Sequence, residues 1–253
     1  SHELLDYVSE LASDKYGGRL TGTAGYDSAA SWLIRHFKDW GIKGKAPSGG
    51  YLQHFDIPYT RVYPGCKVTM HLPQGDKEIL KHYDYVEEFI PGATSDSGTV
   101  KAEVVYAGYG ITAPELGYDD YQDVDVDGKI VMLEREAPLN PSEDTALFRK
   151  WKPYSFHQYK LRNAVRHGAA GMLYNYGPIV NPNNAFEQGF VYSHVGDTVV
   201  RDVFAGTGHT HQEVVGSIRK NLEPFSFSTG KKFTITNHTK HFPNGRGSNV
   251  IGY

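Results

Sequence analysis

Histidine is the residue type through which this sequence could most readily carry out hydrolytic chemistry. The chain has 12 histidines among 253 residues, and zinc-assisted hydrolysis needs at least three convergent His, Asp or Glu ligands with an open coordination position. The HExxH motif is absent, and the closest pair is His209 with His211 in a Gly-rich turn before a helix. No partner carboxylate is identifiable from the sequence. The pattern favours solvated polar residues near a helix start, and we predict no metal ligand in this chain.

A glycine motif raises nucleotide binding as a second kind of chemistry. The segment Gly108–Ala113, GYGITA, matches GxGxxA after an apolar run, which is typical of dinucleotide-binding loops. Such loops need a helix to begin within the motif, so that its amide groups meet the pyrophosphate. Pro114 follows instead, and a loop rich in Gly, Tyr and Asp comes after it. The match is therefore read as accidental, and a nucleotide-binding enzyme is only a third hypothesis.

The remaining reactive side chains form no catalytic pattern. A GxSxG nucleophile elbow is absent, and the Ser-rich segment Gly92–Gly98 is predicted to be a solvated turn. The acidic run Asp119–Asp127 lacks the Gly and Glu positions of an EF-hand loop, so capping of local turns explains it more simply. The single cysteine, Cys66, allows no internal disulfide. The 18 tyrosines could form a binding surface, although tyrosines usually pack with their hydroxyls at the surface. We predict no catalytic residue in this chain.

Charge and hydropathy exclude several classes of partner. The formal net charge is −3 with Lys and Arg scattered along the chain, which gives no attraction to nucleic acid or to an anionic membrane. No apolar run approaches the ~20 residues that a transmembrane helix needs. The length suggests one large domain, or one domain with an appendage.

The secondary structure that must position these residues changes along the chain from helices to strands. Helical spacing of apolar residues predicts helices within the first 41 residues, and strands follow from Tyr51 onward. The expected strands are Gln53–Ile57, Cys66–Leu72, Lys101–Gly108, Lys129–Leu133 and Met172–Tyr174. A helix at Gln158–His167 between the last two predicts a local parallel pairing. Thr210 and Glu213 form a capping box before a further helix.

Several segments resemble a known family in the same order along the chain. The most distinctive, VVYAGYGITAPELGYDDYQDVDVDGKIVML at 104–133, resembles the protease-associated domain inserted in zinc aminopeptidases of metallopeptidase family 28. YKLRNAVRHGAAGMLY at 159–174 resembles the helix and following strand of that domain. GGRLTGTAGYDSAASWLIRHFKDWGI at 17–42 resembles the opening of these peptidases, and SNVIGY at 248–253 resembles the first strand of their catalytic domain.

The resemblance implies a mixed, β-rich α/β fold. A protease-associated domain with a β-sandwich-like or barrel-like core and flanking helices would follow an N-terminal helical segment. The implied domains are 1–46 for the helical segment, 47–246 for the protease-associated domain, and 247–253 for the first strand of a catalytic domain that is otherwise missing. An exposed apolar face on Ala30, Leu33 and Phe37 would support this truncation, whereas a fully covered face would indicate a complete protein.

The resemblance also implies a function. The chain would be the accessory portion of an exported zinc-dependent aminopeptidase, whether periplasmic, secreted or surface-anchored, and would shape substrate access or protein contacts. Its partners would be its own catalytic domain and a peptide or protein substrate. The family's zinc ligands begin with a His-x-Asp motif downstream of the SNVIGY-like strand. Zinc is therefore expected in the missing domain, no cofactor is expected in this chain, and the chain alone would be inactive. The alternative is a free-standing peptide- or protein-binding module.

One residue is a candidate for substrate contact. In glutamate-carboxypeptidase-like members of the family, an Arg shortly before a Lys-x-x-Asn-Ala helix motif contacts the substrate. That motif corresponds here to Lys160–Ala164, and Phe156 with His157 stands in the place of Phe-Arg. His157 is therefore the candidate. The simpler alternative is an exposed loop histidine.

Overall fold

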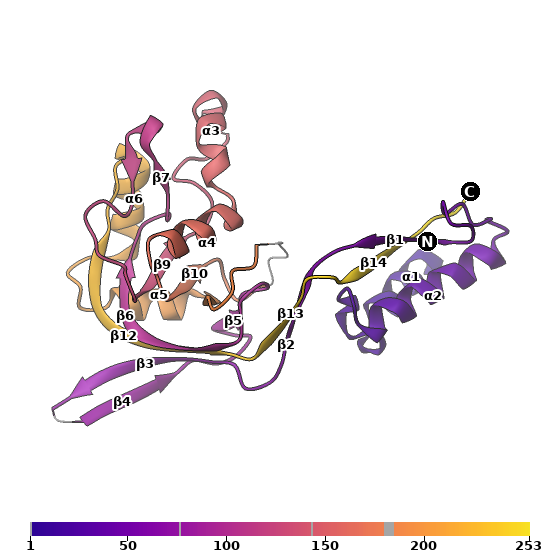
Figure 1. Cartoon of the computed structure of the whole chain (residues 1–253), viewed down its shortest axis with the longest axis horizontal. Coiled ribbons are helices and arrows are strands. Elements are labelled where there is room, and N and C mark those ends of the chain that lie inside the picture. The colour runs from indigo at the N-terminus through magenta and orange to yellow at the C-terminus, as the bar shows by residue number, and fades with distance from the viewer. Residues whose placement is uncertain (1, 76, 143, 180–184) are drawn as a thin grey trace. The chain divides into compact units, whose positions relative to one another are not determined.

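Two compact units divide the chain (Figure 1). The computed structural model describes residues 2–75, 77–142, 144–179 and 185–253. The smaller unit comprises Ser1–Tyr59 with His241–Tyr253, and the larger comprises Thr60–Lys240. Strands β2 (Tyr59–Val62) and β13 (Thr239–Phe242) pair with each other where the chain passes between the units. The larger unit falls within 47–246, and the predicted three-part division stays a prediction.

The larger unit is built on one eight-stranded sheet. Its strand order is β4-β3-β12-β6-β9-β10-β11-β5. The strands are β3 (Lys67–Gln74), β4 (Lys77–His82), β5 (Phe89–Pro91), β6 (Gly98–Tyr106), β9 (Ile130–Glu134), β10 (Gly171–Asn175), β11 (Val191–Val195) and β12 (Phe227–Asn237). Strands β6, β9, β10 and β11 pair in parallel, and the others pair antiparallel with their neighbours.

Helices and short elements fill the connections. They are the two-stranded pair β7 (Thr112–Ala113) and β8 (Tyr118–Asp119), the 3₁₀ helices η2 (Pro114–Leu116) and η3 (Lys152–Tyr154), and the helices α3 (Thr145–Trp151), α4 (His157–Arg166), α5 (Asp197–Phe204) and α6 (His211–Asn221). Helix α4 lies between the parallel strands β9 and β10 in the chain, which confirms the predicted strand–helix–strand unit. The predicted capping box at the start of α6 is also confirmed.

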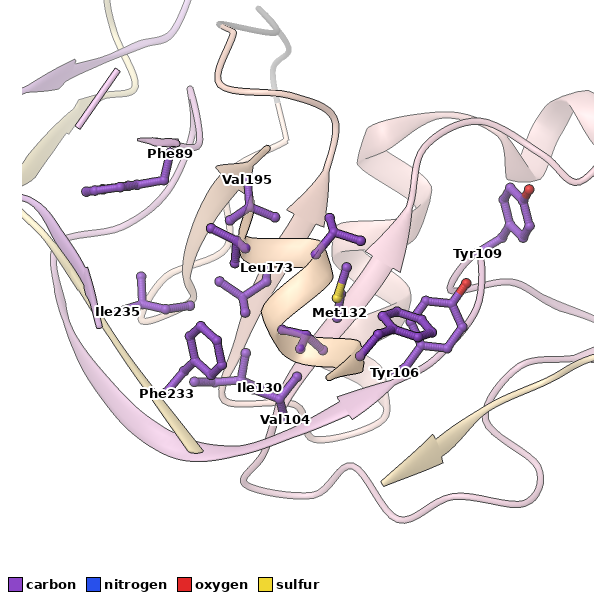
Figure 2. Packing of buried hydrophobic residues seen from close by; sticks show 14 of the residues in the cluster. Phe89, Val104, Tyr106, Tyr109, Ile130, Met132, Leu173, Val195, Phe233 and Ile235 are labelled. Carbon is purple, nitrogen blue, oxygen red and sulfur yellow. The ribbon is translucent and has the colours of Figure 1, made fainter. Parts of the chain in front are cut away.

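Both faces of the central strands are buried. In β9, Ile130 and Met132 belong to one apolar cluster, whereas Val131 and Leu133 belong to another, because successive side chains of a strand point to opposite faces. Helices α5 and α6 add apolar side chains to the first cluster, and α4 adds them to the second. Figure 2 shows the first cluster, in which Leu173 of β10 lies close to Ile130 and Met132.

The predicted mixed α/β class is confirmed. Helix and strand each account for 31% of the chain, with an eight-stranded mixed sheet and N-terminal helices. The core that the resemblance implied as sandwich-like or barrel-like is a single sheet in this structure. Its long strands β6 and β12 are curved in Figure 1, and helices contribute to the core on both of its faces.

The smaller unit combines helices with one strand pair. Its elements are α1 (His2–Ala12), η1 (Asp14–Arg19), α2 (Ala24–Asp39), β1 (Leu52–Asp56) and β14 (Arg246–Val250). Strands β1 and β14 pair antiparallel, so Ser248–Val250 does form strand as predicted. Ala30, Leu33 and Phe37 are half-buried, an outcome between the exposed and the fully covered face.

The sequence prediction for one polar segment is wrong. Gly92–Gly98 is not a solvated turn, because Thr94 and Ser95 are buried. The Ser95 hydroxyl accepts hydrogen bonds from the Asn237 amide at 2.9 Å and from the backbone N–H of Tyr192 at 3.0 Å, which ties the segment to β12 and β11.

The tyrosine hydroxyls also depart from the expected pattern. Those of Tyr106 and Tyr121 are buried without a hydrogen-bond partner among the described residues. Both rings belong to the apolar clusters of the larger unit, so these tyrosines serve as core residues and not as a binding surface.

Candidate functional site

Several buried polar groups gather at the carboxyl ends of the parallel strands. In open α/β sheets this edge is where ligands commonly bind. The loop 107–120 follows β6, Glu134 ends β9, and Asn175 ends β10. The Glu134 backbone N–H donates to the Gly108 carbonyl at 2.8 Å, which joins the loop to the end of β9.

Asp120 holds this loop from within. Its Oδ2 accepts hydrogen bonds from the backbone N–H groups of Tyr109 and Ile111, each at 3.0 Å. Its Oδ1 accepts from the Tyr118 hydroxyl at 2.8 Å. The carboxyl group is buried, and this burial raises its pKa, while the Ile111 amide, the Tyr118 hydroxyl and the nearby Lys160 ammonium oppose the rise.

Lys160 approaches the same loop from the inner face of α4. Its Nζ donates to the backbone carbonyls of Tyr109 and Glu134, the latter at 3.0 Å. The side chain is fully buried. Burial lowers the pKa of this ammonium, and attraction to Asp120 and Glu134 opposes that fall.

Asn163 completes the attachment one helical turn further on. Its Nδ2 donates to the Gly110 carbonyl at 3.0 Å and to the Thr112 hydroxyl at 3.1 Å. Residues three apart lie on one helix face, so the Lys-x-x-Asn spacing directs both donors at the loop. We call Asp120, Lys160 and Asn163 the loop cluster.

The contacts of the loop cluster account for the glycine motif, and nucleotide binding is not needed to explain it. Gly108 has φ +47°, and a Cβ there would lie 2.2 Å from Oδ1 of Asp120; a side chain would thus clash with the carboxylate that fixes the loop. The amides that would face a pyrophosphate in a dinucleotide loop are bonded to Asp120. The only helical segment that follows directly is the three-residue η2, begun by Pro114. The structure therefore supports an accidental match.

A second polar cluster lies at the ends of β9 and β10. Oε1 of Glu134 accepts a hydrogen bond from Nε2 of His211 at 2.8 Å, and Oε2 accepts from the Asn175 amide at 2.7 Å. His211 is the first residue of α6, whose start is fixed by the capping box of Thr210 and Glu213. We call Glu134, Asn175 and His211 the edge cluster.

The edge cluster is more open than the loop cluster. The His211 side chain is 33% exposed, whereas that of Glu134 is 7% exposed. Burial lowers the pKa of His211, but the hydrogen bond to Glu134 and the negative charges of Glu134 and Asp197 together outweigh it, so that the pKa is raised above its ordinary value. An imidazole paired with a carboxylate can exchange a proton near neutral pH. Here the pair joins the start of α6 to the end of β9.

Glu134 and Asn175 were not predicted from the sequence as partners of His211. The prediction of a merely solvated His209–His211 pair is wrong for His211, because Glu134 supplies a carboxylate from 77 residues away. A usable signal exists, since each missed residue is the first polar residue after a buried apolar run. Parallel pairing brings Glu134 opposite Asn175.

The described residues do not fit a zinc site. Nowhere in the described part of the chain do three His, Cys, Asp or Glu side chains come together in an arrangement that could hold a metal ion. His209 packs against the rings of Phe225 and Phe227 at 5.2 and 5.0 Å and does not join His211 on a shared ligand.

The His-x-Asp pattern itself occurs twice, beginning at His54 and at His82. Each of these histidines contacts a hydroxyl through Nδ1: His54 meets Ser248 at 2.8 Å, and His82 meets Thr69 at 3.0 Å. Both triplets thus lie in ordinary strand contacts.

His157 lies where the sequence placed it, at the start of α4, but its surroundings differ. The alternative of an exposed loop histidine is wrong, because the residue is 5% exposed. Its ring packs edge-on against Tyr174 at 4.7 Å and lies 5.7 Å from the ring of His194. Burial first, and then His194 and Lys160, lower its pKa to about 3. The ring is therefore neutral at pH 7, and the substrate contact stays a prediction.

Comparisons with known proteins connect this fold to part of a peptidase. No family model matches the sequence, and no curated protein matches it either. The structure is similar to that of an aminopeptidase from Aneurinibacillus sp. strain AM-1, with a TM-score of 0.52 and 16% identity over 92% of this chain. At that identity the likeness shows the fold alone. The chain spans 43% of the length of that aminopeptidase.

No helix among the described residues is both long enough and apolar enough to cross a bilayer.

Proposed function

We propose that this chain is the accessory, protease-associated portion of an exported zinc-dependent aminopeptidase. In this proposal the larger unit shapes substrate access or protein contacts beside a catalytic domain that the chain does not contain. The observation that carries the proposal is the structural likeness to an aminopeptidase over 92% of this chain but only 43% of that one.

The local structure of the resembling segments supports the proposal. The stretch 104–133 forms β6, the loop held by Asp120, and β9. The stretch 159–174 forms most of α4 and the start of β10, and its Lys-x-x-Asn motif attaches the helix to that loop. The two segments that carry the resemblance are therefore in mutual contact, as expected if they belong to one domain.

The chemistry of the reaction would belong to the remainder of the parent protein. Zinc supplies a Lewis acid and an activated water in such hydrolases, and its ligands would lie outside this chain. The role of this chain would be to bind or orient the substrate and to contact its own catalytic domain. Export is part of the same proposal.

Assay of the purified chain tests the catalytic side of the proposal. We expect the zinc-loaded chain to hydrolyse aminoacyl-p-nitroanilides no faster than buffer containing the same zinc concentration. Hydrolysis that co-purifies with the chain and is abolished by a chelator would contradict the proposal.

The coding sequence downstream tests the structural side. The proposal expects a His-x-Asp motif within a few tens of codons after Tyr253. A natural stop codon at that point would instead favour the free-standing binding module.

A further inference from the structure

The outward face of α4 borders a hollow that the proposed function does not use. Its volume is about 430 Å³. It is lined by Pro153, Phe156, Gln158, Tyr159, Arg162 and Arg166. All of these residues belong to the larger unit. The inner face of the same helix is occupied by the loop cluster, so α4 separates a buried polar attachment from an open, basic and aromatic surface.

Two arginines line this hollow from the same helix. Arg162 and Arg166 are four residues apart on α4, which places them one turn apart on the same face. Like charges at this spacing repel one another mildly. A carboxylate between them would relieve that repulsion and could accept bidentate hydrogen bonds.

The existing partner of Arg162 is exchangeable. Its Nε lies 3.3 Å from Oε1 of Glu187, and the two side chains are 53% and 32% exposed. Exposed pairs of this kind contribute little to stability, so an incoming carboxylate can replace Glu187. Among the described residues, no carboxylate forms an ion pair with Arg166.

The other nearby carboxylates are already hydrogen-bonded. Glu115 accepts from the Tyr154 hydroxyl. Asp119 accepts from the Thr112 hydroxyl at 2.8 Å and from the Tyr121 backbone N–H at 3.0 Å. Neither carboxylate forms an ion pair with either arginine among the described residues.

The aromatic wall of the hollow is held in place. The Tyr159 hydroxyl donates to the Thr112 carbonyl at 2.6 Å, and its ring meets Tyr154 edge-on at 5.0 Å. Burial raises the pKa of Tyr159, and the Arg166 guanidinium opposes that rise, which indicates that this guanidinium lies near the phenol. Phe156 is 51% exposed and adds an apolar surface. Fixed walls lower the entropy lost on binding.

We propose that this hollow binds a peptide segment that carries an acidic side chain next to an aromatic or aliphatic one. The carboxylate would lie between Arg162 and Arg166, and the apolar side chain would pack against Phe156 and Pro153. The apolar walls favour such a peptide over a small inorganic anion. The site is independent of the proposed function, because binding requires no zinc and no catalytic domain.

Fluorescence anisotropy with a labelled peptide tests this site on the whole chain. The probe is a short peptide with Glu-Phe at its centre and with both ends blocked, so that terminal charges play no part. We expect its Gln-Phe counterpart to bind about tenfold more weakly, since the charge-assisted hydrogen bonds are lost. Inorganic phosphate at equal concentration should not displace the probe.

Paired variants assign the binding to the hollow. Arg162→Gln with Arg166→Gln should weaken binding of the Glu-Phe peptide about tenfold and leave that of the Gln-Phe peptide unchanged. The matched control is Arg149→Gln with Lys150→Gln, which removes two exposed positive charges from α3 and should change binding less than about twofold. Phe156→Ser should weaken binding of the Glu-Phe peptide but not that of a Glu-Ala peptide.

Three results would overturn the proposal. One is equal affinity for the Glu-Phe and Gln-Phe peptides, which includes the absence of binding to either. Another is an equal loss in the control and in the test variant, which would indicate general attraction to positive charge. The third is displacement of the probe by phosphate as effective as displacement by unlabelled peptide. All substituted side chains are exposed, and unchanged circular dichroism would confirm that the variants fold.

Discussion

The loop cluster and the edge cluster perform a similar task with different exposure to water. In both, a carboxylate joins two segments that are distant in sequence. Asp120 of the loop cluster is fully enclosed and bonded mainly to backbone amides. Glu134 of the edge cluster is bonded to side chains, one of which, His211, is a third exposed.

This difference in exposure to water indicates which contacts can be lost or titrated while the chain stays folded. A buried charge that loses its partner leaves other buried polar groups unpaired, which is costly. A partly exposed group can turn to water instead. We therefore expect the loop cluster to determine stability, and the edge cluster to adjust it with pH.

Removal of the Asp120 carboxylate should produce the largest effect. Asp120→Ala would leave the amides of Tyr109 and Ile111 unpaired and would remove the negative charge near the Lys160 ammonium. We expect a loss of about 3–5 kcal/mol in the free energy of unfolding. Urea denaturation followed by circular dichroism measures it.

The matched control lies three residues away in the same acidic run. Asp123 is exposed, and Asp123→Ala should change the free energy of unfolding by less than about 0.5 kcal/mol. A similar cost for both substitutions would mean that net charge, and not the buried hydrogen bonds, governs this loop.

Loss of the helix cap beside His211 should have an intermediate effect. Thr210→Ala removes the side chain that accepts from the Glu213 amide, and such caps contribute about 1 kcal/mol. Thr210→Ser keeps the acceptor and serves as the control. If the alanine variant were as stable as the serine variant, the edge cluster alone would suffice to fix the start of α6.

The sequence predicted the elements better than the contacts between them. The apolar run at 130–133, and all but the last residue of the run at 104–107, lie in strands of the sheet, and the capping box was confirmed, because these signals are local. The Lys160 side chain is fully buried, which no local pattern indicates, since lysine is normally solvated. Its ammonium group can be buried because it donates to two backbone carbonyls, one in the turn after β6 and one at the end of β9.

The candidate site was hidden from the sequence for the same reason. Glu134 and His211 are 77 residues apart, and neither stands in a motif that names the other. The buried Ser95 likewise depends on Asn237, which is 142 residues away. A single sequence contains the residues of such clusters but not the pairing that the sheet creates.

The pH dependence of stability should show the smallest effect and should come from the edge cluster. The pKa of His211 in the folded chain is raised above its ordinary value of 6.5, because Glu134 and Asp197 favour the charged form despite burial. A raised pKa means that the folded chain holds this proton more tightly than the unfolded chain does. The resulting stabilisation is fully present below about pH 6.5 and is lost as the pH rises through the folded value.

His211→Gln isolates this contribution. The free energy of unfolding is measured by urea denaturation for the wild-type chain and the variant at pH 6 and at pH 9. We expect the difference between the two proteins to be larger at pH 6 than at pH 9, by up to about 1 kcal/mol. His157 is buried with a lowered pKa, so it contributes a dependence of opposite sign at lower pH in both proteins, and that dependence cancels in the difference. If the difference in free energy of unfolding stayed constant or grew between pH 6 and pH 9, His211 would contribute by packing alone. The edge cluster would then be no more sensitive to pH than the enclosed loop cluster.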